Sequence, residues 1–371
     1  MSERIVIKEI CEVYDGPHAT PKKTVDGPVY LGIDAITDDG KINAKEFAHL
    51  SEEDYIKWTK RVTPQYGDIV FSYEATLGRY ALIPKDFYGC LGRRLAIIRN
   101  VNKDIDTLWL YYYFLSPEWK QFIQSKIIKG STVNRISVED FPTYTVPNIS
   151  IEVQRKIANI LSKIDEKIVL NNNINDNLEQ QIKTIFTFQF LQNANTEWKQ
   201  QSLAELSEMY QPKTISGKDL IADGNYFVYG ANGIIGKYNQ YNHSESEIAV
   251  ACRGASCGSI QMTLPFSWIT GNAMVVKPHS DFPYREYLYY YLLAKNPNYL
   301  CSGSAQPQLT RENLTLYSLK VPSTTELNAF ESYAEKVRKI IIKNQQENIE
   351  LSTLRAWLLP MLMNGQAIIN D

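Results

Sequence analysis

The sequence is poor in the residues from which metal sites and disulfides are built. Its 371 residues include only five cysteines and four histidines, and no histidine has the spacing of a metal ligand. The only close cysteine pair, Cys252 and Cys257, has no further Cys or His partner nearby. We therefore expect no metal site, and we expect free thiols that are buried or half-buried.

Long apolar runs are also absent. No segment approaches the roughly 18 consecutive apolar residues of a membrane-spanning helix. The charged start, Met1-Ser2-Glu3-Arg4, is not followed by the apolar core of a secretory signal. We therefore expect a cytoplasmic protein with no membrane contact. The composition, 44% hydrophobic and 22% charged, is that of a globular chain long enough for two or three domains.

A strong excess of positive charge is missing as well. The net charge is −2, which argues against a protein that binds DNA by electrostatics alone. Two stretches are nevertheless basic, residues 75–100 with a single acid and residues 120–135 with none. Each is compatible with an ordinary solvated face, whereas two in one region favour a local phosphate-facing surface.

The sequence contains a long internal duplication. Nine positions spaced alternately by four and three residues recur 173 positions later, with two asparagines at the same places in both rows. This spacing is typical of a coiled-coil helix, so the duplication predicts two similar domains and two helices that pack together. The first row, which we call the first seam, is Ile157, Leu161, Ile164, Ile168, Asn171, Asn175, Leu178, Ile182 and Ile185. The second seam is Phe330, Ala334, Val337, Ile341, Asn344, Asn348, Leu351, Arg355 and Leu358.

Each repeat begins with a segment of short apolar runs bounded by turn residues. In the first repeat these runs predict strands at residues 29–33, 68–72, 80–83 and 95–98, then an aromatic helix at 108–115 and a second helix at 118–128. The second repeat shows matching strands at 248–251 and 273–276 and an aromatic helix at 287–293. The fold class is therefore α+β. The predicted domains are residues 1–147 and 193–322, and the helical segments are 148–192 and 323–371.

The two long helices carry end signals. Ser150 with Glu152 suits the start of the first helix, Ser323-x-x-Glu326 forms a capping-box pattern for the second, and Pro360 should stop it. Each helix could pack only on its own domain, but the unbroken 3.5-residue period favours mutual, antiparallel packing. Asn171 and Asn175 would then face Asn344 and Asn348 and fix the register. A helix of roughly 35 residues spans about 50 Å, or roughly 15 base pairs.

These features together resemble the specificity subunit of type I restriction-modification enzymes, over nearly the whole chain. The resemblance rests on the joint order of several phrases: Asp15-Gly16-Pro17-His18-Ala19-Thr20-Pro21, Gly67-Asp68-Ile69-Val70-Phe71-Ser72, Gln154-Arg155-Lys156-Ile157-Ala158, Tyr229-Gly230-Ala231-Asn232-Gly233, Gly303-Ser304-Ala305-Gln306-Pro307 and Leu358-Leu359-Pro360-Met361. One position departs from the pattern. Arg355 stands where the first seam has Ile182, so either the seam frays there or the arginine stem lies across it.

The resemblance implies two target-recognition domains, each followed by a long helix, with the helices forming an antiparallel coiled coil. It implies a non-catalytic subunit that binds a bipartite site in double-stranded DNA. It also implies two methyltransferase (modification) subunits as partners and, through them, two restriction subunits that act as nuclease-translocases. S-adenosylmethionine, ATP and Mg would then be held by those partners, with no cofactor in this chain.

Catalytic motifs that would support a self-contained methyltransferase or nuclease are incomplete. Asn296-Pro297-Asn298-Tyr299 lacks the second proline of the adenine methyltransferase loop, and no glycine-rich cofactor loop accompanies it. The segment 230–237 has the wrong glycine spacing for a phosphate-binding loop. Asp106 with Glu118 and Lys120 imitates a nuclease pattern but has no leading Pro-Asp pair. A protein-binding scaffold is the third alternative, and the basic stretches favour DNA over it.

We predict that DNA contacts come from the loops of both domains. Glycine-flanked turns allow close approach of the backbone, and Arg, Asn and Gln can bind base edges through two hydrogen bonds. The alternative is that many of these side chains only satisfy turn backbones. The predicted residues of the first domain are His18, Thr20, Ser72, Tyr73, Arg79, Ser131, Thr132, Asn134 and Arg135, and those of the second are Tyr229, Asn232, Arg253, Ser256, Asn272, Ser304 and Gln306.

Overall fold

The computed structural model describes residues 3–130, 133–303 and 306–366. The chain divides into two compact units. Unit 1 comprises Met1–Ile168 and Ile349–Asp371, and unit 2 comprises Val169–Asn348. Each unit therefore contains one predicted domain together with one part of each long helix, so the units do not follow the sequence order of the repeats.

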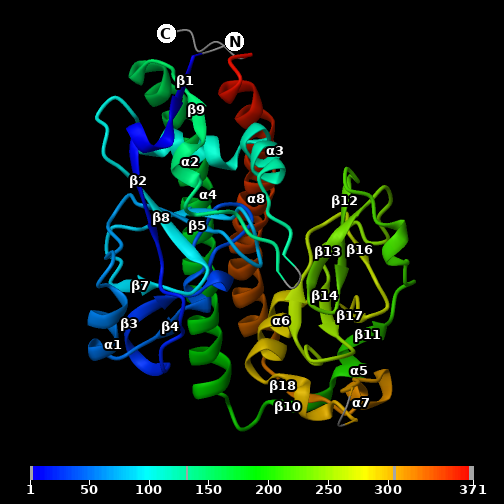
Figure 1. Ribbon diagram of the computed structural model, residues 1–371. Helices are drawn as coiled ribbons and strands as arrows, with labels where there is room; N and C mark the ends of the chain where they lie inside the picture. The colour runs from blue at the N-terminus through cyan, green and yellow to red at the C-terminus, as the bar shows by residue number, and fades with distance from the viewer. Residues whose placement is uncertain (1–2, 131–132, 304–305, 367–371) are drawn as a thin grey trace. The chain divides into compact units, whose positions relative to one another are not determined.

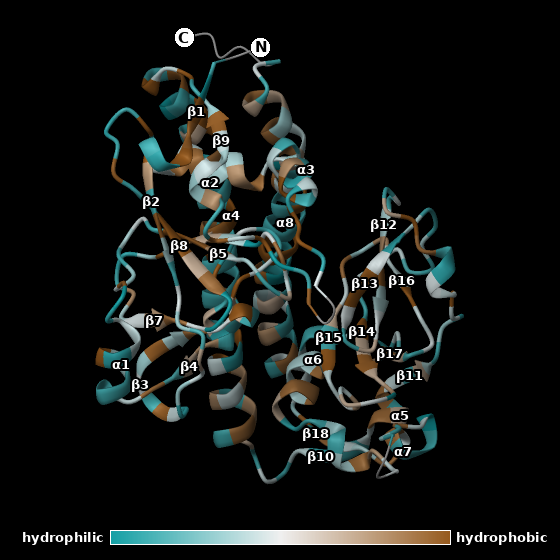
Figure 2. Cartoon of the chain, viewed as in Figure 1, coloured by the Kyte–Doolittle hydropathy of each residue, from teal (hydrophilic) through white to brown (hydrophobic). Residues whose placement is uncertain are grey.

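Unit 1 is built around a four-stranded antiparallel sheet in the order β2-β8-β5-β6 (Figure 1). Both faces of this sheet are buried because apolar residues stand at successive positions of the central strands. On β5, Ile69 and Phe71 enter one core, whereas Val70 enters another on the opposite face. Figure 2 shows the matching hydrophobic colour along β8. These strands are β2 (Cys11–Asp15), β5 (Ile69–Ser72), β6 (Tyr80–Leu82) and β8 (Leu95–Asn100).

The remaining strands of unit 1 form two small sheets. In the first, β3 pairs antiparallel with β4 and parallel with β7, and in the second β1 pairs with β9. Their bounds are β1 (Arg4–Val6), β3 (Thr24–Leu31), β4 (Ala48–His49), β7 (Gly89–Leu91) and β9 (Thr145–Pro147). The helices of this domain are α1 (Glu52–Trp58), the aromatic α2 (Thr107–Leu115) and α3 (Pro117–Ser125). The aromatic run of α2 is buried in the core that includes Ile69.

Unit 2 repeats this topology strand for strand, which confirms the duplication. Its sheets have the orders β11-β17-β14-β15, β13-β12-β16 and β10-β18, again with one parallel pair, β12 with β16. The strands are β10 (Lys199–Ser202), β11 (Ser207–Tyr210), β12 (Tyr226–Gly230), β13 (Gly233–Tyr238), β14 (Ile248–Ala251), β15 (Ile260–Met262), β16 (Trp268–Ile269), β17 (Ala273–Pro278) and β18 (Ser318–Val321). The helices are α5 (Leu203–Leu206), the aromatic α6 (Arg285–Ala294) and α7 (Arg311–Thr315).

The two long helices, α4 (Ile151–Phe186) and α8 (Thr324–Met363), pack antiparallel in each unit. In unit 1, the start of α4 shares a core with the end of α8, where Leu161 and Leu359 are buried. In unit 2, the end of α4 shares a core with the start of α8, where Ile182 and Phe330 are buried. The same cores include the aromatic helices α2 and α6, so each long helix packs both on its partner and on a domain.

The asparagines of the seams hydrogen-bond across the helix pair of unit 2. Asn171 Nδ2 donates to Asn348 Oδ1 at 2.9 Å, and Asn344 Nδ2 donates to Asn175 Oδ1 at 2.8 Å. Asn171 is fully buried. A buried asparagine whose amide N–H groups find acceptors only in one pairing disfavours other registers, and the role of these residues in fixing register remains a prediction.

Arg355 does not interrupt the second seam. In unit 1 its guanidinium lies 3.0 Å from the Asp165 carboxylate and 5.7 Å from the centre of the Tyr112 ring. Tyr112 OH donates to the same carboxylate at 2.7 Å. The Arg355 charge therefore has a partner at the edge of the seam, and α8 continues past this residue to Met363.

Two sequence-based expectations were wrong. Pro360 does not end α8, which runs on to Met363, because Leu362 and Met363 beyond it are buried in the core of unit 1. Cys257 is not a free thiol but forms a disulfide with Cys301, 44 residues away in sequence. The fold brings these two loops together, and a search for close sequence spacing could not find the pair. Cys11, Cys90 and Cys252 are free and buried, and burial raises the thiol pKa of Cys11 and Cys90 to about 12.

Within the described residues, no helix is long and apolar enough to cross a membrane. The same part of the chain has no group of three or more His, Cys, Asp or Glu residues that could hold a metal ion.

Candidate nucleic-acid interface

Three loops of unit 1 meet at the end of strand β5. Tyr73, directly after β5, donates its backbone N–H to Arg94 O at 3.1 Å and accepts at its carbonyl from Ile136 N at 2.8 Å. The next residue, Glu74, forms a backbone bridge with Arg135. The sheet register thus joins the loop after β5, the turn before β8 and the hairpin after α3, although 62 positions separate Tyr73 from Arg135.

Unit 2 assembles the same three loops at the end of β14. Cys252 donates its N–H to Asn272 O at 2.9 Å and accepts from Leu309 N at 2.9 Å. Arg253 forms a backbone bridge with Gln308. The predicted residues Arg253 and Asn272 therefore lie on neighbouring loops, as Tyr73 and Arg135 do in unit 1.

The predicted DNA-contacting residues differ widely in exposure. Ser72, Tyr73 and Tyr229 are buried, and Arg79 and Ser256 are half-buried. Ser131, Thr132 and Ser304 lie outside the described residues. The exposed predicted residues are His18, Thr20, Asn134, Arg135, Asn232, Arg253, Asn272 and Gln306.

Several of the less exposed side chains have structural partners. Ser72 Oγ donates to Thr76 O and accepts from Arg79 N, so it satisfies the turn after β5. Tyr229 OH accepts from Leu264 N at 3.1 Å. The Arg79 guanidinium lies 2.6 Å from the Asp38 carboxylate. Burial raises the pKa of the Tyr73 hydroxyl, and the Asp15 carboxylate raises it further. For Ser72 and Tyr229 the structure supports the turn interpretation.

The sequence did not single out an ion pair at the centre of the unit 1 loops. Arg94 Nε lies 2.8 Å from Glu74 Oε2. Both Arg94 and Ala75 have left-handed backbone conformations, with φ of 73° and 65°. For a non-glycine residue this conformation costs roughly 1–2 kcal/mol, whereas a partly exposed ion pair contributes about 0–1 kcal/mol. The ion pair alone does not offset the strain of both residues, so the surrounding backbone hydrogen bonds must hold these turns, and backbone strain of this kind clusters at functional sites.

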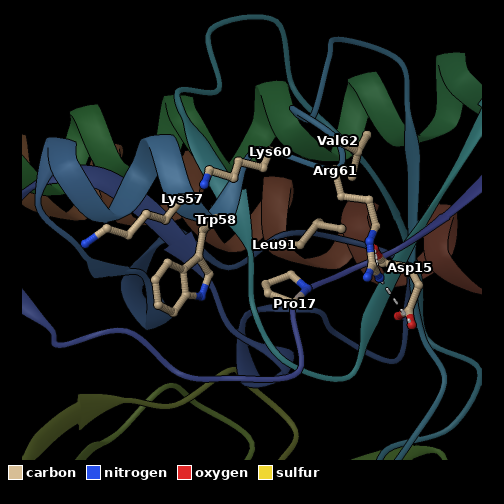
Figure 3. A pocket seen from close by; sticks show the side chains of 8 residues that line it. All are labelled: Asp15, Pro17, Lys57, Trp58, Lys60, Arg61, Val62 and Leu91. Atoms are coloured by element: carbon tan, nitrogen blue, oxygen red, sulfur yellow. Dashed lines mark hydrogen bonds and ion pairs between the residues drawn. The ribbon is translucent and has the colours of Figure 1, made fainter.

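A pocket of about 210 Å³ lies beside these loops in unit 1 (Figure 3). The residues that line it are Asp15, Pro17, Lys57, Trp58, Lys60, Arg61, Val62 and Leu91. The Trp58 indole N–H is buried and has no hydrogen-bond partner. The Asp15 carboxylate lies 2.9 Å from His18 Nε2 and 3.8 Å from the Arg61 guanidinium, and the Lys57 ammonium group lies 2.8 Å from the Glu53 carboxylate. Lys60 is exposed and has no ion-pair partner within the described residues, so the pocket presents a net positive rim suited to a phosphate.

We expect Lys60 to contribute one phosphate contact. Lys60→Gln should weaken DNA binding to a similar degree for all sequences and reduce the slope of log affinity against log salt by about 0.9. Lys60→Arg, which keeps the charge, should preserve the slope. Titrations of the protein with DNA at several salt concentrations measure both quantities. An unchanged slope in Lys60→Gln would remove this lysine from the interface.

The chain is similar to proteins of one family along most of its length. A family model described as the type I restriction modification DNA specificity domain matches residues 2–180 and again residues 195–352. A curated relative, the type I restriction enzyme EcoprrI specificity subunit of Escherichia coli, is 26% identical over 69% of this chain and 67% of its own length. The MjaIX specificity subunit of Methanocaldococcus jannaschii is 21% identical over 87% and 82%.

Among solved structures, the S subunit of a type I restriction-modification system from M. genitalium has a similar fold. The match has a TM-score of 0.59 at 15% identity and covers 100% of this chain and 97% of that one. At this identity the likeness supports the shared architecture of two domains and two long helices. It gives no information on which DNA sequence is recognised.

Proposed function

Because the chain belongs to the type I restriction-modification DNA specificity family, we propose that it recognises a bipartite DNA target and directs partner subunits to it. Specificity subunits of this family recognise DNA and are non-catalytic, and this chain is one of them. The finer proposal is that unit 1 and unit 2 each contact one half-site. The observation that carries it is the repeated topology of two domains whose loop residues differ.

The physical argument is that a common framework presents two different sets of side chains. Backbone hydrogen bonds at matching positions hold the loops in both units, so their geometry does not depend on the exposed side chains. The loops can therefore vary without loss of the fold. Two such loop sets in one chain suit a target with two unlike parts, whose bases are distinguished in the major groove.

The partners we propose are two methyltransferase subunits and, through them, two restriction subunits. S-adenosylmethionine, ATP and Mg would be held by those partners. Exposed apolar side chains on the long helices support protein contacts, because solvated helix faces are normally polar. In unit 1 these are Val153, Leu354 and Trp357, and in unit 2 they are Val169, Leu170, Ile174, Tyr333 and Ile340.

Reconstitution tests the proposal. The purified chain alone should transfer no methyl group from S-adenosylmethionine to DNA. Together with its methyltransferase subunit it should yield methylated adenines in one defined sequence with two parts and a spacer of fixed length. Transfer by the isolated chain, or methylation by the complex without a defined target, would contradict the proposed function.

A further inference from the structure

The internal duplication allows the recognition loops of the two units to be superposed position by position through their hydrogen bonds. In the central strands, Ser72 pairs with Leu95 and Ala251 pairs with Ala273. One step further, Tyr73 N meets Arg94 O, and Cys252 N meets Asn272 O. Arg94 of unit 1 therefore occupies the position of Asn272 in unit 2.

The two neighbouring loops match in the same way. Glu74 bridges Arg135 in unit 1, and Arg253 bridges Gln308 in unit 2. The following residues, Ile136 and Leu309, donate their backbone N–H groups to equivalent carbonyls at 2.8 and 2.9 Å. We call the three matched positions the recognition triplet. It consists of Glu74, Arg94 and Arg135 in unit 1 and of Arg253, Asn272 and Gln308 in unit 2.

All six triplet residues belong to types that bind base edges directly. Arginine pairs with guanine through two hydrogen bonds, asparagine and glutamine pair with adenine, and glutamate accepts from the cytosine amino group. None of the three positions has the same residue in both units. Four of these residues are exposed: Arg135, Arg253, Asn272 and Gln308. The other two are partly exposed, with 29% of the Arg94 side chain and 31% of the Glu74 side chain accessible to solvent.

Backbone strain is concentrated at this triplet. Among the described residues, three non-glycine residues have positive φ, and two of them are Arg94 and Ala75. In unit 2 the position of Ala75 is taken by Gly254, with φ of 76°, a residue that adopts this conformation without strain. In unit 1, by contrast, both Ala75, which follows Glu74, and Arg94 have left-handed backbone conformations. The ion pair between Glu74 and Arg94 therefore connects two turns with fixed backbone geometry, and these turns set the direction of the Arg94 side chain.

We propose that the recognition triplet determines base specificity in each unit, with Arg94 and Asn272 as equivalent base-contacting residues. Glu74 acts as a positioning residue for Arg94 in the unbound state. This inference rests on the proposed function, since it assigns particular residues to the recognition of each half-site. It extends the interface to Glu74, Arg94 and Gln308, which sequence patterns did not identify.

The test is to map methylated sites with the assembled enzyme carrying Arg94→Asn, which places in unit 1 the side chain that unit 2 has there. Asparagine tolerates positive φ better than arginine, so the variant should fold. At one base pair of the first half-site the preference should change, and methylation of the original site should fall about 5- to 150-fold, as expected for one lost bidentate contact. The second half-site should be unchanged and serves as an internal control.

Arg93→Ala is the matched control, because Arg93 is the exposed neighbour of Arg94 in the same turn. It should leave the target sequence as it is. Asn272→Asp should alter only the second half-site, which keeps the inference testable if the unit 1 variant misfolds. Original targets and rates in both Arg94→Asn and Asn272→Asp would overturn the inference alone. A wild-type complex without a two-part target would overturn the proposed function and the inference with it.

Discussion

Replacing Arg338 by methionine is expected to destabilise the protein by about 3–5 kcal/mol, because the buried Glu286 carboxylate then keeps only Arg285, at 4.0 Å, as a positively charged neighbour. In unit 2 the Arg338 side chain is 6% exposed and lies 3.1 Å from Glu286 Oε2, whose side chain is 0% exposed. The guanidinium also contacts Glu179 at 2.5 Å and Tyr290 OH at 3.0 Å. This network joins α8, α4 and the start of α6. Urea denaturation of the full chain measures the loss.

Unit 1 supplies a matched control for this prediction. Arg355→Met removes an arginine of the same seam, but its partner Asp165 is 19% exposed and keeps the hydrogen bond from Tyr112. We expect a loss of only about 1–2 kcal/mol. Adding Glu286→Gln to Arg338→Met should recover part of the stability, since the fully buried carboxylate is then replaced by a neutral amide. Equal losses for the two arginines would show that burial of the partner carboxylate does not decide the cost.

The pH dependence of the Arg338→Met variant follows from Glu286. Burial raises the pKa of Glu286 above its ordinary value, against the attraction of Arg338. Without Arg338 that pKa should rise further. A carboxyl with a higher pKa in the folded state binds its proton more tightly there, so stability increases as the pH falls and is lost as the pH rises through the folded-state pKa. The deficit of the variant should therefore be smaller at acidic pH than at neutral pH.

Local patterns were sufficient to predict the strands, the aromatic helices and the two seams. Alternating or continuous apolar residues decide which segments are buried, and the period of the seams decides that the helices pair. The residue types of Arg135, Arg253 and Asn272 likewise marked them as exposed loop residues. These features depend on near neighbours in the sequence.

Features that depend on distant pairings could not be predicted. The disulfide between Cys257 and Cys301 and the ion pair between Glu74 and Arg94 arise where sheet register brings separate loops together. The continuation of α8 through Pro360 reflects burial of the last turn in the core of unit 1. The sequence offered one signal for the strained turn of unit 1. Gly254 in unit 2 has the same left-handed conformation as its counterpart Ala75, so a glycine at this position marks a turn that requires positive φ. Recognising that required the register of both sheets.

Inserting one heptad into both long helices should lengthen the spacer between the two half-sites by about three base pairs. The insertions belong after Ile168 in α4 and after Asn348 in α8, at the boundary between the units. Seven helical residues at about 1.5 Å each add about 10 Å, and base pairs rise by about 3.4 Å. The loops and the asparagine pairs of unit 2 are untouched, so both half-site sequences should stay the same. Methylated-site mapping with the assembled enzyme measures the spacer.

A heptad inserted into α4 alone is the control for this experiment. It leaves the two helices unequal by seven residues, so the apolar seam positions of unit 1 and the asparagine pairs of unit 2 cannot all be satisfied together. We expect this variant to lose stability and site-specific methylation. The double insertion keeps every pairing within each unit, lengthens the distance between the units and rotates one domain relative to the other by the added helical twist. If the double variant folds, assembles and methylates sites with the original spacer, the helices do not set the distance between the half-sites.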